Sequence, residues 1–425
     1  MADQYTTTSK QGYGSRLGGA FKGILGGLAI FALSFVLLWW NEGRTVRQTR
    51  ALEEGAGAVV EADAATVDPA LEGQLVHVTG VLTNLETLAD GEFGVEADAL
   101  ALRRRVQMYQ WVEHTKTSKK VNLGGSETTE TTYTYVKEWV DGYEDSSRFA
   151  HPEGHGNLAP RYEAAEWFAT ARLGARDFPA ERLAAVGDAE PVTWEAEWQP
   201  VDEAAIAAQN AAIDAENEAL LAAATDGAVP ELKAHVDLEA AKAAAAAKSP
   251  KKLAGSFYIG KDPAAPEVGD MRVSYEAVKA HEVSVVAAQK GSTFGAWTAK
   301  NGNAIFLQSD GIRTAEEQFA GAKSANKVMA WLLRLVGFVM MMAGLKAVLA
   351  PLKVLADVLP FLGSIVGWAN GVVAFLVALP LTLVTIGLAW LAYRPMVGIP
   401  LLVVAGVLLV MGIVKAAKKK PAAAS

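Results

Sequence analysis

The chain of 425 residues contains no cysteine. This absence excludes disulfides, cysteine-ligated zinc or iron–sulfur sites, and catalysis by a thiol. The formal net charge is −8, which argues against nucleic acid as a partner because phosphate binding needs clustered lysine and arginine. The sequence also lacks a P-loop and a dinucleotide-binding fingerprint, so it has no recognisable nucleotide site.

Catalytic and metal-binding patterns are equally scarce. His151 and His155 belong to the segment His-Pro-Glu-Gly-His, which lacks the HExxH order of helical zinc sites, and its proline and glycine indicate a loop. No serine lies in a nucleophile-elbow pattern. We therefore expect a protein without enzymatic activity, cofactor or bound metal.

Long apolar runs are missing from the middle of the chain and are concentrated at its ends. One run covers residues 18–40, and three more cover residues 329–349, 371–393 and 397–415. Each is close to the roughly 20 residues with which a helix crosses the hydrocarbon core of a bilayer. The sequence therefore predicts four transmembrane helices, one N-terminal and three C-terminal, with a large polar domain at residues 41–328.

The distribution of basic residues predicts an orientation. The tail at residues 416–425 contains three consecutive lysines, and the N-terminal tail (1–17) and the connection at 350–370 are mildly basic. Because basic residues favour the cytoplasmic side, we expect both termini in the cytoplasm and the large domain outside it.

The large domain is predicted to be an α+β fold dominated by antiparallel sheet. Its candidate strands, which are rich in β-branched or alternating residues, are 74–83, 105–113, 131–140, 270–276, 282–288 and 303–308. The polar residues 115–130 include Gly124 and Gly125, which indicate the tip of a hairpin.

An alanine-rich segment at residues 202–248 interrupts the strands. Alanine is the best helix former, and Pro230 breaks the segment into two helices because proline is costly inside a helix. We predict a helical insertion that projects from the sheet. Its narrow, alanine-based apolar faces favour a solvated insertion over an interaction surface.

Several charged residues are predicted to meet at one membrane face, namely Glu42, Arg44, Arg334 and Arg394. Arg334 lies near the start of an apolar span, where a charge is costly unless it is paired or hydrated. We predict that Glu42 pairs with Arg334 or Arg394 and locks the helices together. The alternatives are that the arginines bind an anionic lipid headgroup or extend to the interface without a specific partner. Gly43 is predicted to end the first helix in a left-handed cap.

Short segments along most of the chain resemble the transmembrane protein 43 (LUMA) family. The most distinctive lies at residues 102–113. The motif residues are Asn41, Glu42, Gly43, Arg44, Arg105, Tyr109, Trp111, His155, Asp270, Tyr393, Arg394 and Pro395. The resemblance implies a multi-pass membrane protein with an extracytoplasmic domain, self-association and no established enzymatic activity. The alanine- and glycine-rich composition suggests a bacterial member, for which the inner (plasma) membrane is the expected location.

Three functions remain open. The first is a non-enzymatic membrane scaffold that self-associates through its extracytoplasmic domain and organises membrane or partner proteins. The second is a lipid-binding or lipid-sensing module that uses the arginines at the membrane face. The third is an enzyme with an unrecognised site. The expected partners are membrane lipids, further copies of the chain and other membrane proteins, and not nucleic acid.

Overall fold

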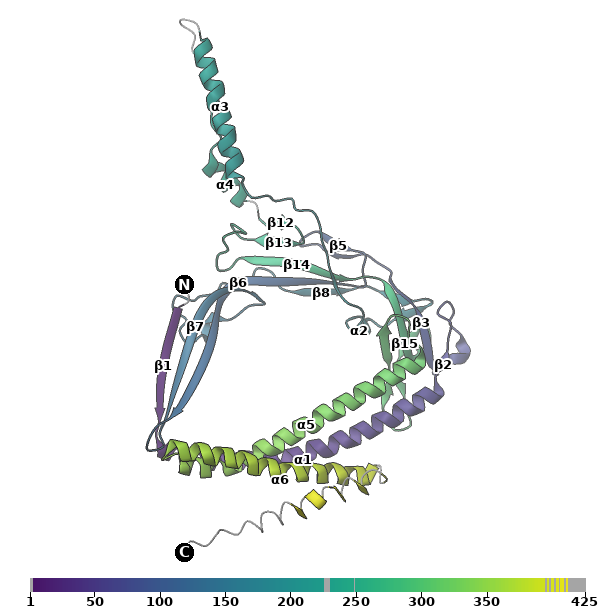
Figure 1. Ribbon diagram of the computed structural model, residues 1–425. Coiled ribbons are helices and arrows are strands. Elements are labelled where there is room, and N and C mark those ends of the chain that lie inside the picture. Colours follow the sequence, from purple (N-terminus) through teal and green to yellow (C-terminus); the bar gives the residue numbers. More distant parts are fainter. Residues whose placement is uncertain are drawn as a thin grey trace.

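The structure is a computed structural model that describes residues 3–224, 230–247 and 249–393, together with positions 396, 399–400, 403–404, 406–408 and 410–411. Within these residues, three long helices lie together and a β-rich arch connects their two ends, so the molecule outlines a ring (Figure 1). The helices are α1 (Tyr13–Ala58), α5 (Ala315–Ala356) and α6 (Pro360–Tyr393). Each is long and apolar enough to cross a membrane. This confirms the prediction of apolar helices before and after a β-rich domain in the sequence.

The helices are longer than the apolar runs that predicted them. α1 continues past residue 40 to Ala58, and α5 begins at Ala315, because these ends pack on the domain. Leu52 of α1 and Phe319 of α5 are almost completely buried there in one hydrophobic cluster. Each such side chain contributes about 1.5–3 kcal/mol by leaving water.

Two further predictions concern the C-terminal region. The connection predicted at residues 350–370 is helical apart from a short turn between Ala356 and Pro360. The predicted fourth span, residues 397–415, lies mostly outside the described residues, and the basic tail at 416–425 lies wholly outside them.

Small residues allow α1 and α5 to approach closely. A Cβ atom on Gly27 would lie 2.8 Å from the Cβ of Ala347, and one on Gly344 would lie 2.7 Å from the carbonyl oxygen of Gly27. Backbone contact of this kind is typical of helices that associate in membranes.

Gly43 does not cap α1, contrary to the prediction. It lies inside the helix, and a Cβ at this position would lie 2.8 Å from the hydroxyl oxygen of Tyr393. Gly43 therefore provides space for the end of α6 rather than a left-handed turn.

The arch contains an eight-stranded sheet. Its main path runs β1 (Asp3–Gln11), β7 (Glu127–Asp141), β6 (Ala101–Val121), β14 (Met271–Val278), β13 (Ser256–Ile259) and β12 (Lys251–Leu253). Two more strands join it from the side, β8 (Ala165–Phe168) on β6 and β11 (Glu190–Pro191) on β14. As predicted, β6 and β7 form an antiparallel hairpin whose tip contains Gly124 and Gly125, both with positive φ.

A second, seven-stranded sheet joins the arch to the helices. It comprises β2 (Val60–Glu61), β3 (Leu75–Asn84), β9 (Ala171–Leu173), β10 (Arg176–Phe178), β15 (His281–Lys290), β16 (Thr293–Gly295) and β19 (Leu307–Asp310). Strands β3, β9, β10, β16 and β15 close on one another as a small barrel. Buried Val78, Leu173, Val285 and Phe294 fill its core. The other short elements are β4 (Leu88–Asp90), β5 (Val95–Ala97), β17 (Trp297–Thr298), β18 (Ala304–Ile305), α2 (Ala180–Leu183) and the 3-10 helices η1 (Pro69–Leu71) and η2 (Ser146–Arg148).

The N-terminal residues form part of the domain. Residues 1–17 were predicted to be a separate cytoplasmic tail, but residues 3–11 form β1, which pairs antiparallel with residues 127–135 of β7. The sequence did not indicate this strand, because a polar strand without an apolar face has no local signal that distinguishes it from a tail.

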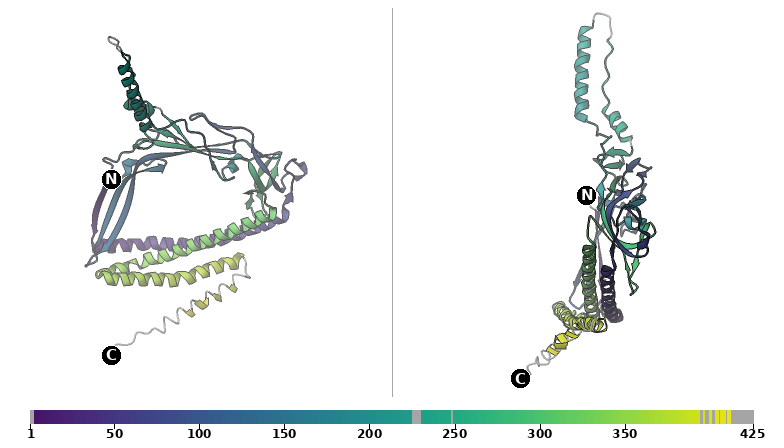
Figure 2. Two further views of the ribbon diagram at one scale, coloured as in Figure 1. Left: turned by 45° about the horizontal axis from the view of Figure 1, so that its top comes forward. Right: turned by 90° about the vertical axis from the view of Figure 1, so that its right-hand side faces the viewer.

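The alanine-rich insertion projects away from the arch, as both views in Figure 2 show. It contains α3 (Glu203–Ala223) and α4 (Leu238–Ala247). Residues 230–237 return along α3 in extended form, held by Asn210 and Asn217, whose side chains pair with the backbones of Val236 and Lys233. The predicted pair of helices is therefore present.

Candidate functional site

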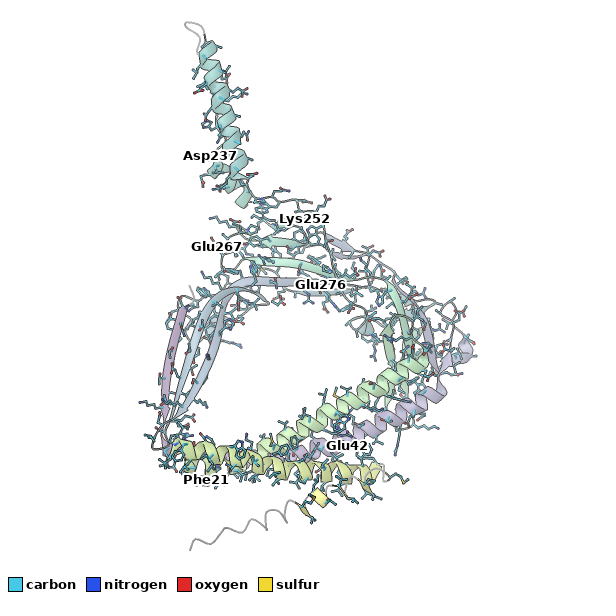
Figure 3. All side chains as sticks on the ribbon, viewed as in Figure 1. Phe21, Glu42, Asp237, Lys252, Glu267 and Glu276 are labelled. Atoms are coloured by element: carbon cyan, nitrogen blue, oxygen red, sulfur yellow. The ribbon has the colours of Figure 1, made fainter. Side chains whose placement is uncertain are left out.

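Glu42 is fully buried among the three long helices (Figure 3). Nε of Arg334 on α5 donates a hydrogen bond to its Oε1 at 2.6 Å, and Nη2 donates to Oε2 at 2.8 Å. The indole N–H of Trp390 on α6 also donates to Oε2. Charge-assisted bidentate pairs are among the stronger hydrogen-bonding arrangements in proteins. Glu42 therefore links α1, α5 and α6 at one point.

Aromatic rings complete the surroundings of Arg334. Its guanidinium lies 4.8 Å from the ring centre of Trp331 and 5.7 Å from that of Trp390. A cation over an aromatic face is stabilised by the ring quadrupole, and more strongly where water is excluded. The pairing predicted for Glu42 is thus present with Arg334. The other predicted partner, Arg394, and the motif residue Pro395 lie outside the described residues.

Arg44 does not join this cluster. Its Nη1 donates to Oδ1 of Asn326 at 3.1 Å, and the amide of Asn326 donates to the carbonyl oxygen of Thr45 at 3.0 Å. Nearby, Nδ2 of Asn41 donates to the carbonyl oxygen of Ala330 at 3.0 Å. These polar contacts extend the α1–α5 contact beyond Glu42.

Tyr393 lies at the end of α6, beside Gly43. Its carbonyl oxygen accepts a hydrogen bond of 2.9 Å from Nη2 of Arg50. Between α1 and α6, an open groove of about 550 Å³ is lined by Phe35, Val36, Trp39, Trp40, Arg47, Leu381, Val384, Thr385, Leu388 and Tyr393. The groove is largely apolar, and the guanidinium of Arg47 is among its lining groups.

The other motif residues lie in the arch, far along the chain from this cluster. Arg105 forms an exposed ion pair of 2.7 Å with Glu276. Asp270 is buried and accepts hydrogen bonds from the hydroxyl of Tyr258 and the backbone N–H of Glu267. Burial and the neighbouring carboxylate raise the pKa of Tyr258, so its hydroxyl remains a donor. Asp270 therefore fixes the loop that precedes β14.

Tyr109 and Trp111 hold loops against the outer edge of β6. The backbone N–H of Tyr109 donates to the carbonyl oxygen of Asp270 at 2.8 Å. The N–H and C=O of Trp111 both bond to the side chain of Asn157. These contacts cover the edge of β6 only as far as Trp111.

His155 anchors the end of β1. Its buried ring stacks on Tyr135 at 4.0 Å, and its Nε2 lies 3.3 Å from Oδ2 of Asp3. Nδ1 lies 2.9 Å from the carbonyl oxygen of His151. In the described part of the chain, no group of three or more histidine or acidic side chains could hold a metal ion.

A second constellation, which the sequence analysis missed, joins the start of α1 to the hairpin tip. Arg16 is largely buried; its Nη2 lies 2.6 Å from Oδ2 of Asp357, and its Nη1 donates to the carbonyl oxygen of Gly125 at 2.5 Å. The N–H of Gly124 donates to the carbonyl oxygen of Val358 at 3.0 Å. The hairpin tip, the start of α1 and the α5–α6 turn therefore meet at one buried ion pair.

We call the structure that ends at this junction the arm. It consists of β1 and the distal parts of β6 (residues 113–121) and β7 (residues 127–135), with the tip at 122–126. All nine residues of β1 are exposed. The arm has no aliphatic side chain except Val121 at the end of β6 and Leu123 in the tip, so it is polar on both faces.

The chain was also compared with known proteins. The family model described as "Transmembrane protein 43" matches residues 108–395. Human Transmembrane protein 43 is 32% identical over 92% of this chain and 89% of its own length, and the rat protein is 31% identical over the same shares. A homolog from Drosophila melanogaster is 27% identical over 88% of this chain and 90% of its own length. No solved structure matches.

Proposed function

Because the chain belongs to the transmembrane protein 43 family, we propose that it is a non-enzymatic scaffold of membranes that self-associates through its β-rich domain. The supporting observation is the arm, whose sheet has two edges of equal length that are not paired with any strand in the described part of the chain. Residues 127–135 of β7 pair with β1 on one side and with residues 113–121 of β6 on the other. Unpaired edges are templates for the addition of another strand.

On each of these edges, the backbone N–H and C=O of every second residue point away from the neighbouring strand. Trp111 directs its N–H and C=O away from β7, to Asn157, so Thr117 directs its own groups the same way. Thr131 of β7, which lies opposite Thr117, consequently turns its backbone to Thr7 of β1. The neighbouring Thr8 therefore presents its N–H and C=O to the open edge.

The strand directions select one pairing between copies. β1 and β6 are both antiparallel to β7 and therefore run in the same direction. If copies share one membrane, the β1 edge of one copy meets the β6 edge of the next in parallel. This is a head-to-tail contact, which forms a closed ring when the rotation between neighbouring copies closes. Pairing two β1 strands antiparallel would instead turn the helices of the second copy away from the membrane.

The charged residues of the arm predict that β1 of one copy and β6 of the next pair with a shift in register. Without such a shift, Asp3 would lie beside Glu113 of the next copy and Lys10 beside Lys120. The members of each of these two pairs lie opposite the same residue of β7. Like charges placed opposite each other destabilise a sheet. A staggered register avoids them, and closed rings of strands require such a stagger.

The test is the oligomeric mass in a mild detergent. Thr8→Pro removes an outward N–H without removing a hydrogen bond to β7, whereas Thr8→Val retains the N–H and serves as the control. We expect wild type and Thr8→Val to form the same discrete oligomer, and Thr8→Pro to form smaller species. Equal masses for all three proteins would contradict pairing through this edge, and a monomeric wild type would contradict self-association.

A second candidate function is lipid recognition. The groove between α1 and α6 supports it because apolar walls suit an acyl chain and Arg47 suits an anionic headgroup. Arg334 supports it less, since its guanidinium is already bonded to Glu42. Native mass spectrometry should show anionic lipid retained by wild type and lost from Arg47→Ala. Retention unchanged by Arg47→Ala would contradict this site.

A further inference from the structure

Helix α3 of the insertion holds an extended segment of the chain by its backbone. The side-chain amide of Asn217 donates to the carbonyl oxygen of Lys233 at 2.9 Å and accepts from the N–H of the same residue at 2.8 Å. Asn210 makes the same two hydrogen bonds with Val236, at 3.0 and 2.8 Å. Each asparagine therefore satisfies both backbone groups of one residue, whatever side chain that residue carries.

The spacing of the two asparagines matches an extended chain. They are seven residues apart, which is about 10.5 Å along a helix axis. Lys233 and Val236 are three residues apart, which is about 10 Å along an extended chain. Together with Ile206 and Ile213, the asparagines are the only residues of α3 that are partly buried. These four residues form a single stripe that fits an extended chain running antiparallel to the helix.

Acidic side chains beside this stripe select basic ones. Nζ of Lys233 lies 2.8 Å from Oε2 of Glu216, and Nε2 of His235 lies 2.7 Å from Oδ1 of Asp214. Residues 202–224 contain five acidic residues and no basic residue, whereas the bound segment carries two acidic residues of its own. A chain with more basic side chains would therefore complement the stripe better than the segment that occupies it.

The bound segment, residues 230–237, is held weakly. No residue of α3 is buried, and all four side chains of the two ion pairs are more than half exposed. Exposed ion pairs contribute little to stability. The insertion also projects away from the arch (Figure 2), so the segment can leave the stripe without disturbing the sheets.

We propose that α3 is a binding site for an extended, basic segment of a partner protein, and that residues 230–237 occupy this site until such a segment displaces them. The asparagines bind the backbone of the partner, and the acidic side chains beside them bind its lysine, arginine or histidine residues. This surface is polar, which is why the narrow apolar faces of the insertion did not indicate it. The site goes beyond self-association through β1 and stands on the contacts of the insertion alone.

The occupying segment can be weakened without changing α3. Lys233→Pro combined with Val236→Pro removes the two N–H groups that donate to the asparagines. Ala234→Pro is the matched control, because the N–H groups bound by the asparagines belong to the other two residues. Both variants are compared with wild type as full-length proteins in detergent.

The probe is a fluorescent peptide with the sequence of residues 230–237, in which Glu231→Lys and Asp237→Lys add positive charge. Its affinity for each protein is measured by fluorescence anisotropy. We expect the double-proline variant to bind the peptide at least about tenfold more tightly than wild type or the control, because a site that is mostly occupied has a lower apparent affinity. Equal affinity for the three proteins, or binding to none of them, would overturn the proposal.

The asparagines supply a second comparison. Adding Asn210→Leu and Asn217→Leu to the double-proline variant should weaken binding at least about tenfold, since leucine favours a helix but cannot bond a backbone. Unchanged affinity would contradict recognition by the stripe. In wild type, excess peptide should accelerate hydrogen exchange at the amides of Lys233 and Val236, which lose their acceptors when the segment is displaced. Unchanged exchange would also overturn the proposal.

The oligomeric mass distinguishes a partner protein from a second copy of this chain. Asn210→Leu with Asn217→Leu, introduced into wild type, should leave the mass of the purified protein unchanged, because no partner is present. A smaller oligomer would show that the stripe receives residues 230–237 of a neighbouring copy, and would overturn the assignment to a partner. This test and the Thr8→Pro test of self-association can fail independently, since they alter different elements.

Discussion

Removing Arg334 is expected to destabilise the helices more than removing Arg334 and Glu42 together. In the Arg334→Met variant, Glu42 remains fully buried, and of its three polar contacts only the Trp390 hydrogen bond is left. Breaking a buried pair by removing one partner typically costs about 3–5 kcal/mol, because the remaining charge is uncompensated. Replacing both charges by neutral groups of similar volume costs much less.

The measurement is a double-mutant cycle on the free energy of unfolding in detergent, with Glu42→Gln, Arg334→Met and the double variant. We expect a loss of about 3–5 kcal/mol for Arg334→Met and a coupling energy of roughly 2 kcal/mol or more. Arg44→Met is the matched control, since Arg44 lies two residues from Glu42 on α1 and donates its hydrogen bond to the neutral amide of Asn326. Its loss should cost about 1.5–3 kcal/mol, the range for a hydrogen bond between a charged and a neutral group.

Two results would refute this reasoning. One is a loss for Arg334→Met that does not exceed that for Arg44→Met, which would mean that the ion pair adds nothing beyond a hydrogen bond from a guanidinium to a neutral amide. The other is strict additivity of the two single losses in the double variant, which would mean that Glu42 and Arg334 act independently.

Three further outcomes are expected. Gly27→Leu should lose about 1–3 kcal/mol by overpacking the α1–α5 contact, while Gly26→Leu, which has open space around it, should be nearly neutral in the same unfolding assay. Arg16→Met should release the arm tip from Asp357, and hydrogen exchange at the amides of residues 113–121 should rise about tenfold for each 1.4 kcal/mol lost; unchanged exchange would contradict the anchoring role. Burial and the hydrogen bond to Glu113 raise the pKa of Tyr135 to about 12, so the unfolded state loses this proton first and stability falls as pH rises from about 10 to 12. Tyr135→Phe should flatten that decline, and an unchanged slope would contradict the assignment.

Local patterns were sufficient to predict the long helices and five of the longer strands. Apolar runs marked the three long helices, and alternating or β-branched residues marked β3, β6, β7, β14 and β15. The Glu42–Arg334 pair could also be predicted, because a buried charge in an apolar helix requires a partner, and the order of the spans supplied only a few.

Features that depend on distant partners could not be predicted. Arg16 resembled an ordinary basic flank of an apolar run, and its partner Asp357 lies 341 positions away. β1 consists of polar residues without an apolar face, and only its pairing with residues 127–135 makes it a strand. Gly43 matched a cap pattern locally, whereas its actual neighbour is Tyr393 at the end of α6.

The pairing of β1 with β7 also sets an order of events during synthesis. Residues 3–11 leave the ribosome before their partners, which end at Tyr135, about 120 residues further along the chain. At about 5–20 residues per second, the N-terminal strand waits on the order of ten seconds without its partner. Arg16 waits still longer, until Asp357 has been made. Residues 3–11 are therefore available to chaperones or to neighbouring chains during this interval, and the ring closes only once Asp357 has been made.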